Sequence, residues 1–184
     1  MGPVAGWLRN KLRMRLGLIC LIAAGAVGQI ADQTVEYQVK AAFLLNFAKF
    51  VEWPPNVFAA ADSPVAICVL GKDPFGQALD EVVHGETVGS RRLVVQRISK
   101  VPAPRMCQVV FAGSGEKDLP EVLSSLGRGV LAVGEGDKFL RDGGMIAMVV
   151  ENRRVRFDVN QTATANAGLN LSSRLLTVAR SVKN

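Results

Sequence analysis

Short apolar runs rich in β-branched residues recur along this chain and alternate with stretches that have the pattern of helices. Strands are predicted at 65–70, 92–98, 106–111 and 130–133, with helices between them at 74–83 and 119–126. Strands separated by helices need crossover connections, and such connections make neighbouring strands parallel. The pattern therefore predicts an α/β fold with Rossmann-like alternation, in which helices pack on a mixed sheet.

The second half of the chain adds a predicted antiparallel hairpin, made by two apolar runs at 145–150 and 155–159 that flank Asn152 and Arg153. Side chains alternate between the two faces of a strand. In the second run this places three residues inward (Val155, Phe157 and Val159) and three outward (Arg154, Arg156 and Asp158). Residues 161–182 predict one broken helix or two.

A long amphipathic helix is predicted at 34–52, because apolar residues recur every four positions up to the stop at Pro54 and Pro55. The helix at 74–83 is expected to begin at Pro74, with Asp73 as its N-cap. No linker rich in Pro, Gly or Ser divides residues 29–184, so one compact domain is expected there.

The first 28 residues have the order of a secretory signal peptide. Four cations lie between positions 9 and 15, and an apolar run follows at 16–27. The run is shorter than the roughly 20 residues that cross a bilayer. Cleavage is predicted after Gly28, or after Ala31 as a second choice, and an uncleaved anchor is the alternative. The mature domain would then be residues 29–184.

The net charge of +6 belongs largely to this leader. Residues 1–28 hold four basic residues and no acidic one, so the remainder has 18 basic and 16 acidic residues and a net charge of +2. A nucleic-acid-binding domain needs a basic stripe in the mature chain. We therefore expect no nucleic-acid partner.

Export also affects whether the cysteines are expected to be free thiols or a disulfide. Cys20 lies in the apolar run of the leader, whereas Cys68 and Cys107 lie in apolar runs that predict buried strands. Two separate buried thiols would suit a reducing compartment, and a disulfide would suit an oxidising one. Export favours the disulfide.

The sequence predicts no catalytic residues, no metal site and no cofactor. His84 is the one histidine, which excludes any site that needs two His ligands. There is no Gly-x-Ser-x-Gly motif, and the glycine loops at 113–118 and 134–139 both lack the third glycine of a dinucleotide fingerprint. We therefore expect a protein that is not an enzyme.

Arg154 and Arg156 are the candidate binding residues. Two arginines that point outward from one strand either form an ordinary solvated face or bind an acidic partner or a small anion.

Several segments together resemble the YfiR family of exported bacterial proteins, in the same order along the mature chain. They are YQVKAAFLLNFAKFVEWP at 37–54, ICVLGKDPF at 67–75, GGMI at 143–146, RFDVN at 156–160 and LSSRLL at 171–176. The resemblance implies a periplasmic, non-enzymatic regulator. Such a protein binds the periplasmic sensor region of a membrane diguanylate cyclase and inhibits it, which lowers cyclic-di-GMP and biofilm formation.

The resemblance has further implications for partners and disulfides. It implies sequestration by an OmpA-like outer-membrane lipoprotein, and it leaves a homodimer open. Cys68 and Cys107 match the positions of a family disulfide, whereas no cysteine remains for the second disulfide of the best-known member. The same domain also occurs in sensor kinases, so the alternative is a periplasmic module that binds a small ligand, an anion or nucleotide, and feeds such a kinase.

Overall fold

The computed structural model describes residues 34–113 and 115–184. The predicted signal peptide at 1–28 and Cys20 lie outside the described residues. From Tyr37 onward the chain forms one compact unit. Among the described helices, none combines the length and the apolar character that a membrane span requires.

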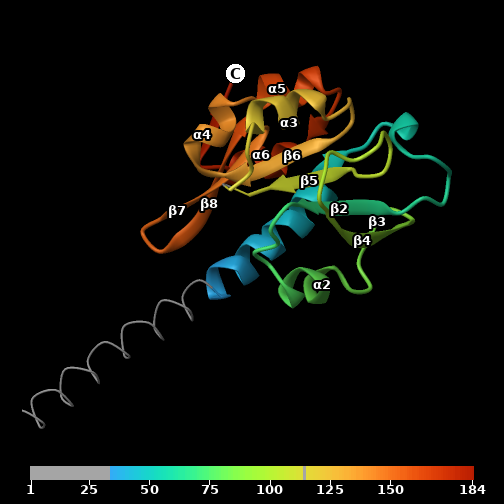
Figure 1. The fold of residues 1–184 in the computed structure, drawn as a ribbon, viewed down its shortest axis with the longest axis horizontal. Helices are drawn as coiled ribbons and strands as arrows, with labels where there is room; N and C mark the ends of the chain where they lie inside the picture. Colours follow the sequence, from blue (N-terminus) through green and yellow to red (C-terminus); the bar gives the residue numbers. More distant parts are fainter. Residues whose placement is uncertain (1–33, 114) are drawn as a thin grey trace, which may run out of the picture. The chain divides into compact units, whose positions relative to one another are not determined.

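An eight-stranded mixed sheet is the centre of the fold, as expected from the alternation of strands and helices (Figure 1). The strands are β2 (Val65–Leu70), β3 (Thr87–Val88), β4 (Arg91–Ile98), β5 (Val109–Ala112), β6 (Leu131–Glu135), β7 (Ile146–Glu151), β8 (Arg154–Asn160) and β10 (Ser181–Lys183). Their order in the sheet is β10-β8-β7-β6-β5-β2-β4-β3. The central strands pair in parallel, whereas β7 with β8 and β3 with β4 are antiparallel.

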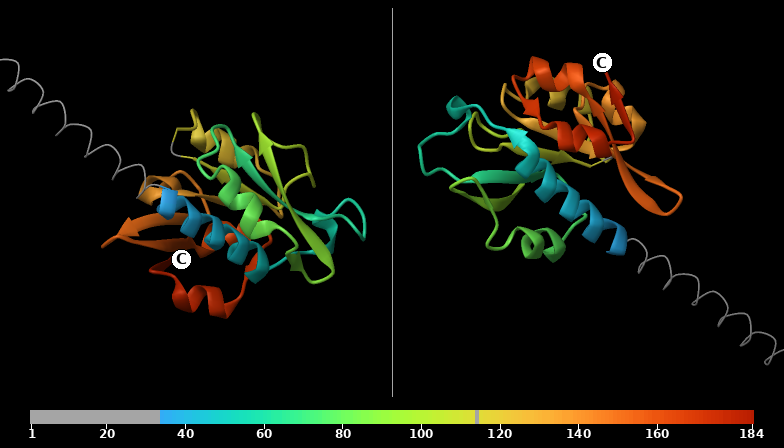
Figure 2. Two further views of the ribbon diagram at one scale, coloured as in Figure 1. Left: turned by 90° about the horizontal axis from the view of Figure 1, so that it is seen from below. Right: turned by 180° about the vertical axis from the view of Figure 1, so that it is seen from behind.

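Helices lie on both sides of this sheet. The helix at 34–50 and α2 (Gln77–Val83) lie on one side, and α3 (Leu119–Ser125) and α4 (Gly136–Arg141) lie on the other (Figures 1 and 2). The other helices are α5 (Gln161–Asn166), α6 (Ser173–Val178) and the short 3-10 helix η1 (Pro55–Val57).

The helix at 34–50 is held to the sheet by aromatic and ionic contacts. The rings of Phe43 and Phe47 pack edge-on against Phe157 of β8, with centroids 5.6 and 5.0 Å apart. Lys40, which is 4% exposed, forms an ion pair with Glu135 at the end of β6. Since Phe47 and Phe157 are both fully buried, the amphipathic pattern of this helix reflects core packing.

Three predicted boundaries are wrong. The long helix ends at residue 50, and Val51–Glu52 forms strand β1, which pairs with β9 (Asn170–Leu171) in a separate two-stranded sheet. The C-terminal segment contains two short helices, α5 and α6, but also the strands β9 and β10. Cys107 lies just before β5 rather than on it.

The start of α2 also differs from the prediction. The helix begins at Gln77, and Asp73 instead closes the preceding turn by accepting hydrogen bonds from the backbone N–H groups of Phe75 and Gly76. Gly76 has a φ of +54°, which cannot continue a helix from Pro74.

Candidate functional site

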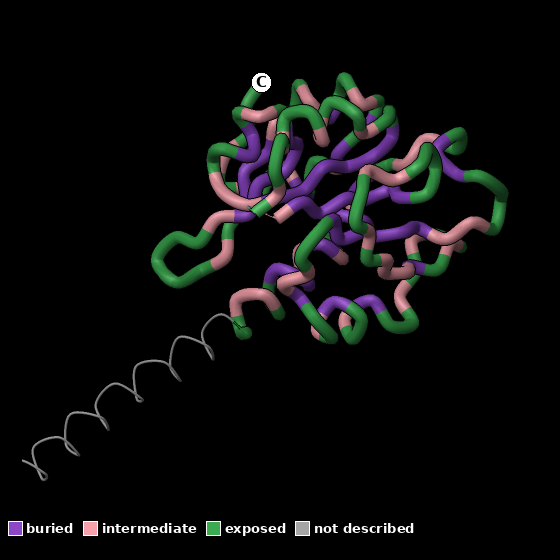
Figure 3. The backbone as a smooth tube through the Cα atoms, in the orientation of Figure 1, coloured by how far each residue is buried: buried purple, intermediate pink, exposed green. Residues whose placement is uncertain are grey.

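The tip of the β7–β8 hairpin projects beyond the main sheet and is the most exposed part of these two strands (Figures 1 and 3). Asn152 and Arg153, with φ of +50° and +61°, form the two-residue turn. Positive φ at both turn positions matches the twist of the flanking strands. The prediction of a hairpin across these two residues is confirmed.

The hairpin tip, defined here as residues 150–156, holds three exposed arginines. Arg154 lies opposite Glu151 and Arg156 opposite Val149, so both predicted residues are on one strand and both are exposed. No described residue forms an ion pair or a side-chain hydrogen bond with either arginine. The Glu151 carboxylate accepts instead from Arg180 at 3.3 Å.

An apolar side chain accompanies these charges. The side chain of Val150, on β7, is 51% exposed. The tip therefore combines three unpaired cations with an apolar contact point, a composition that suits an acidic protein surface.

Asp158 contradicts the prediction that it points outward. It is 1% exposed, and Arg180 donates to it from Nε at 2.8 Å and from Nη2 at 2.5 Å. The reason is that the outward face of the sheet is not open to water at this point, because Arg180, which also donates to Asp137 of α4, lies over the Asp158 side chain. The hydrogen bond with Asp158, followed by that with Glu151, raises the pKa of Arg180.

Sequence reasoning missed Arg180 altogether. It lies in a short connection between α6 and β10, and neither helical nor strand periodicity marks it. Arg180 contacts both parts of the hairpin, because it donates to the buried Asp158 at the base and to Glu151 at the tip.

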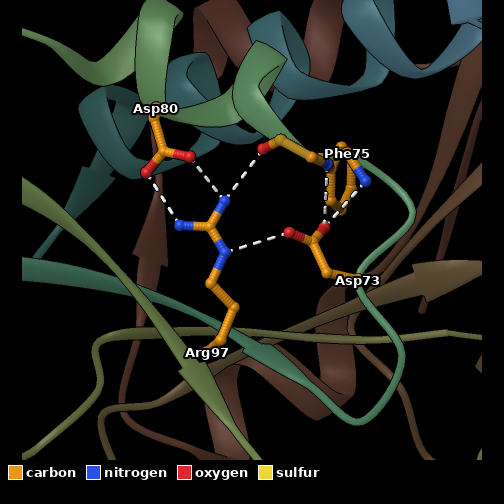
Figure 4. Close-up of polar contacts among 5 residues, drawn as sticks. Asp73, Phe75, Asp80 and Arg97 are labelled. Atoms are coloured by element: carbon orange, nitrogen blue, oxygen red, sulfur yellow. Dashed lines mark hydrogen bonds and ion pairs between the residues drawn. The ribbon is translucent and has the colours of Figure 1, made fainter.

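The carboxyl ends of β2 and β4 hold a second polar cluster, centred on Arg97 (Figure 4). Arg97 donates to Asp73 at 2.9 Å, to both carboxylate oxygens of Asp80 at 2.7 and 2.5 Å, and to the Gly76 carbonyl at 2.8 Å. The hydrogen bond from Arg97 lowers the pKa of Asp80, and the same bond is the main cause of the raised pKa of Arg97. This cluster ties the turn after β2 to α2 and β4.

The crevice between β2 and β5 is where doubly wound folds bind nucleotides, because the strand order reverses there. In this chain a Cβ atom on Gly71 would lie within 1.8 Å of Glu116 Oε1, so the Glu116 carboxylate occupies the space above the end of β2. A carboxylate in that position repels a phosphate. The geometry disfavours a nucleotide at this edge.

Cys68 and Cys107 are joined by a disulfide, with their Cα atoms 5.9 Å apart. Cys68 lies in the middle of β2, and Cys107 lies two residues before the start of the neighbouring strand β5. The disulfide therefore joins β2 to the segment that leads into β5. Both residues are buried. Within residues 34–113 and 115–184, no three His, Cys, Asp or Glu side chains are grouped as metal ligands.

The chain is similar to one known protein family and to one solved structure. A family model described as YfiR/HmsC-like matches residues 37–180. A crystal structure of a conserved domain protein from Vibrio cholerae O1 biovar El Tor is similar at 12% sequence identity, with a TM-score of 0.45. That alignment covers 64% of this chain and 54% of the other, so the chain spans about half the length of that protein.

Proposed function

Because the chain belongs to the YfiR/HmsC-like family, we propose that it is a periplasmic regulator that binds the periplasmic sensor region of a membrane-bound diguanylate cyclase and inhibits the enzyme. The family match over residues 37–180 is the observation that carries this proposal. Inhibition lowers cyclic-di-GMP and, with it, biofilm formation. The protein acts by binding, and it performs no chemistry of its own.

The hairpin tip is the surface that we propose for this interaction. Its arginines can donate several charge-assisted hydrogen bonds to carboxylates, and Val150 supplies an apolar contact beside them. Exposed cations also speed the encounter with an acidic partner, since opposite charges attract before contact. The partner surface is therefore expected to be acidic with a small apolar depression.

A rigid base suits a hairpin that acts as a binding element. Asp158 and Arg180 hold β8 to β10, and Phe157 is fixed between Phe43 and Phe47. Such a hairpin loses little conformational entropy when its tip is bound. An OmpA-like outer-membrane lipoprotein that sequesters the protein would relieve the inhibition, and a tip shared by both partners would make their binding mutually exclusive.

Deletion of the gene in the native bacterium tests the function. We expect raised cyclic-di-GMP and greater surface attachment, both restored by the full-length gene. A gene that lacks codons 2–28 is the matched control, because its product would stay in the cytoplasm and fail to complement. Unchanged cyclic-di-GMP in the deletion strain would contradict the proposal.

A further inference from the structure

A cavity of about 360 Å³ lies at the amino ends of β5 and β6, on the opposite edge of the sheet from the Arg97 cluster. The loops that precede β2, β5 and β6 form most of its wall, together with the turn after α5. Its apolar lining consists mainly of Pro54, Val57, Pro102, Pro104, Leu126 and Val130. The volume falls in the range of about 300–1,000 Å³ that is usual for small-molecule sites.

The charge of the cavity has one sign. Arg105 and Arg128 line it, and no acidic residue does. Neither arginine side chain forms an ion pair or a hydrogen bond with any residue that the structure describes. This sets them apart from Arg97 and Arg180, whose guanidinium groups are each held by carboxylates.

The Arg128 guanidinium lies against the cavity wall. A Cβ atom on Gly168, itself a lining residue, would lie 3.1 Å from Arg128 Nη2. Gly168 also has a φ of +74°, so glycine is favoured there both by the backbone and by the close approach of Arg128. Arg128 and Arg105 are both exposed at the mouth of the cavity, and the Arg128 guanidinium lies close to the backbone at Gly168 while its donors have no protein acceptor among the described residues.

The walls of the cavity are held by hydrogen bonds and by the disulfide. The Gly129 N–H donates to the Ala167 carbonyl at 2.8 Å, which joins the two loops beside Arg128. The buried Gln108 side chain donates to the Val57 carbonyl at 3.1 Å and accepts from the Ala66 N–H at 2.9 Å. Cys107, another lining residue, is tied to β2 by the disulfide. A cavity with walls fixed in this way loses little entropy on binding a ligand.

We infer that this cavity binds a small organic anion, a phosphate or carboxylate attached to a compact apolar body. Arg128 and Arg105 would hold the anionic group by charge-assisted hydrogen bonds, and the proline-rich wall would cover the apolar body. The inference does not depend on the cyclase as partner. It concerns a different edge of the sheet from the hairpin tip, and it is tested on the purified protein alone.

Calorimetric titration with phenyl phosphate at low ionic strength tests the inference. Benzoate is the carboxylate probe, inorganic phosphate lacks the apolar body, and benzyl alcohol lacks the charge. We expect one site for phenyl phosphate or benzoate, with much weaker binding of the other two compounds. Arg128→Gln should weaken binding by about tenfold or more, since it removes a charge-assisted bidentate contact. Arg105→Gln added to Arg128→Gln should weaken the binding of the anion further.

Arg141→Gln is the matched control, because Arg141 is exposed like Arg105 and Arg128 but lies on α4, outside the cavity, so this variant should bind as the wild type does. Thermal unfolding of each variant in phosphate-free buffer shows that the fold is intact. The inference is overturned if neither anion binds at millimolar concentration, if benzyl alcohol or inorganic phosphate binds as tightly as phenyl phosphate, or if a folded Arg128→Gln protein binds as the wild type does.

Discussion

Arg180 and Asp158 form a two-bond ion pair in which the carboxylate is 1% exposed and the guanidinium donates through Nε and Nη2. The pair joins the connection before β10 to the middle of β8. Because Arg180 also reaches Glu151 and Asp137, each at 3.3 Å, it links the base of the hairpin to the hairpin tip and to α4.

We predict that Arg180→Met lowers the free energy of unfolding more than Asp158→Asn does. The first change leaves a buried carboxylate without its cation, which is the costly way to break such a pair. In the second, Arg180 keeps its contacts with Glu151 and Asp137 and remains partly in water. Urea denaturation of both variants gives the comparison, with Arg141→Met as a control. Equal losses would show that burial of Asp158 is unimportant.

A second prediction concerns acid stability at the Arg97 cluster. Arg97 lowers the pKa of Asp80 below its ordinary value of 3.8. A carboxylate with a lowered pKa stabilises the fold fully above its ordinary value, and this contribution is lost as the pH falls through the lowered value. Because Arg97 and Asp80 are 38% and 49% exposed, solvent screening limits the contribution to about 1 kcal/mol.

Arg97→Met should therefore destabilise the protein at pH 6, and the difference from wild type should shrink below about pH 4. Urea unfolding between pH 3 and pH 6 measures this difference. Asp80→Asn is the control, since it removes the same titration while Arg97 keeps Asp73. If the difference in the free energy of unfolding between wild type and Arg97→Met grew toward low pH, the ion pair of Arg97 with Asp80 would not be its cause.

The periodic parts of the fold could be predicted from the sequence. The strand at β2 and the hairpin were foreseen because their residues alternate or cluster in the pattern of a buried sheet. The short strands β1, β9 and β10 were not, because two or three residues hold no periodicity and their pairing depends on distant segments. Asp158 was misplaced because its partner Arg180 lies 22 residues further along the chain and meets it only in the folded protein.

The residues of the two candidate binding surfaces also differ in whether the sequence could predict them. Arg154 and Arg156 could be singled out because strand alternation requires them to share a face. Arg105 lies in the loop before β5 and Arg128 in the loop before β6. They reach one cavity only because β5 and β6 are parallel neighbours, so that their amino ends lie side by side. No spacing rule along the chain connects them.

The disulfide gives a third prediction. Thiol labelling of the exported chain under denaturing, non-reducing conditions should find no free thiol at Cys68 or Cys107. Replacement of both by alanine should lower the free energy of unfolding by about 2–5 kcal/mol, because the unfolded chain then gains conformational freedom. Reduction of the wild type should reproduce that loss, whereas reduction of the double variant should change nothing. Two labelled thiols in the native protein would exclude the bond.

Processing of the leader gives a fourth prediction. Intact-mass measurement of protein from the periplasm should show the loss of about 28 to 31 residues, since small residues precede Gln29 and Asp32 at the expected cleavage sites. Gly28→Leu should shift or slow the cleavage, and Gln29→Ala serves as a control next to the same bond. Recovery of the full-length chain in the cytoplasm would rule out export.

The last prediction tests the hairpin tip as the contact surface. Arg154→Ala with Arg156→Ala removes two unpaired cations, and a well-paired arginine at an interface commonly contributes about 2 kcal/mol or more. Binding to the cyclase's periplasmic sensor region should weaken by more than about tenfold, and cyclic-di-GMP should rise part of the way to the level of the deletion strain. Thermal stability should stay nearly unchanged, because both side chains are exposed and contact no described acidic group.

Arg92→Ala with Arg141→Ala is the matched control, with the same loss of charge at exposed sites away from the hairpin. If the control pair weakens binding as much as the hairpin pair, net charge rather than the tip governs the interaction. If the hairpin variant regulates as the wild type does while the deletion has its effect, the regulatory function stands and the contact surface lies elsewhere.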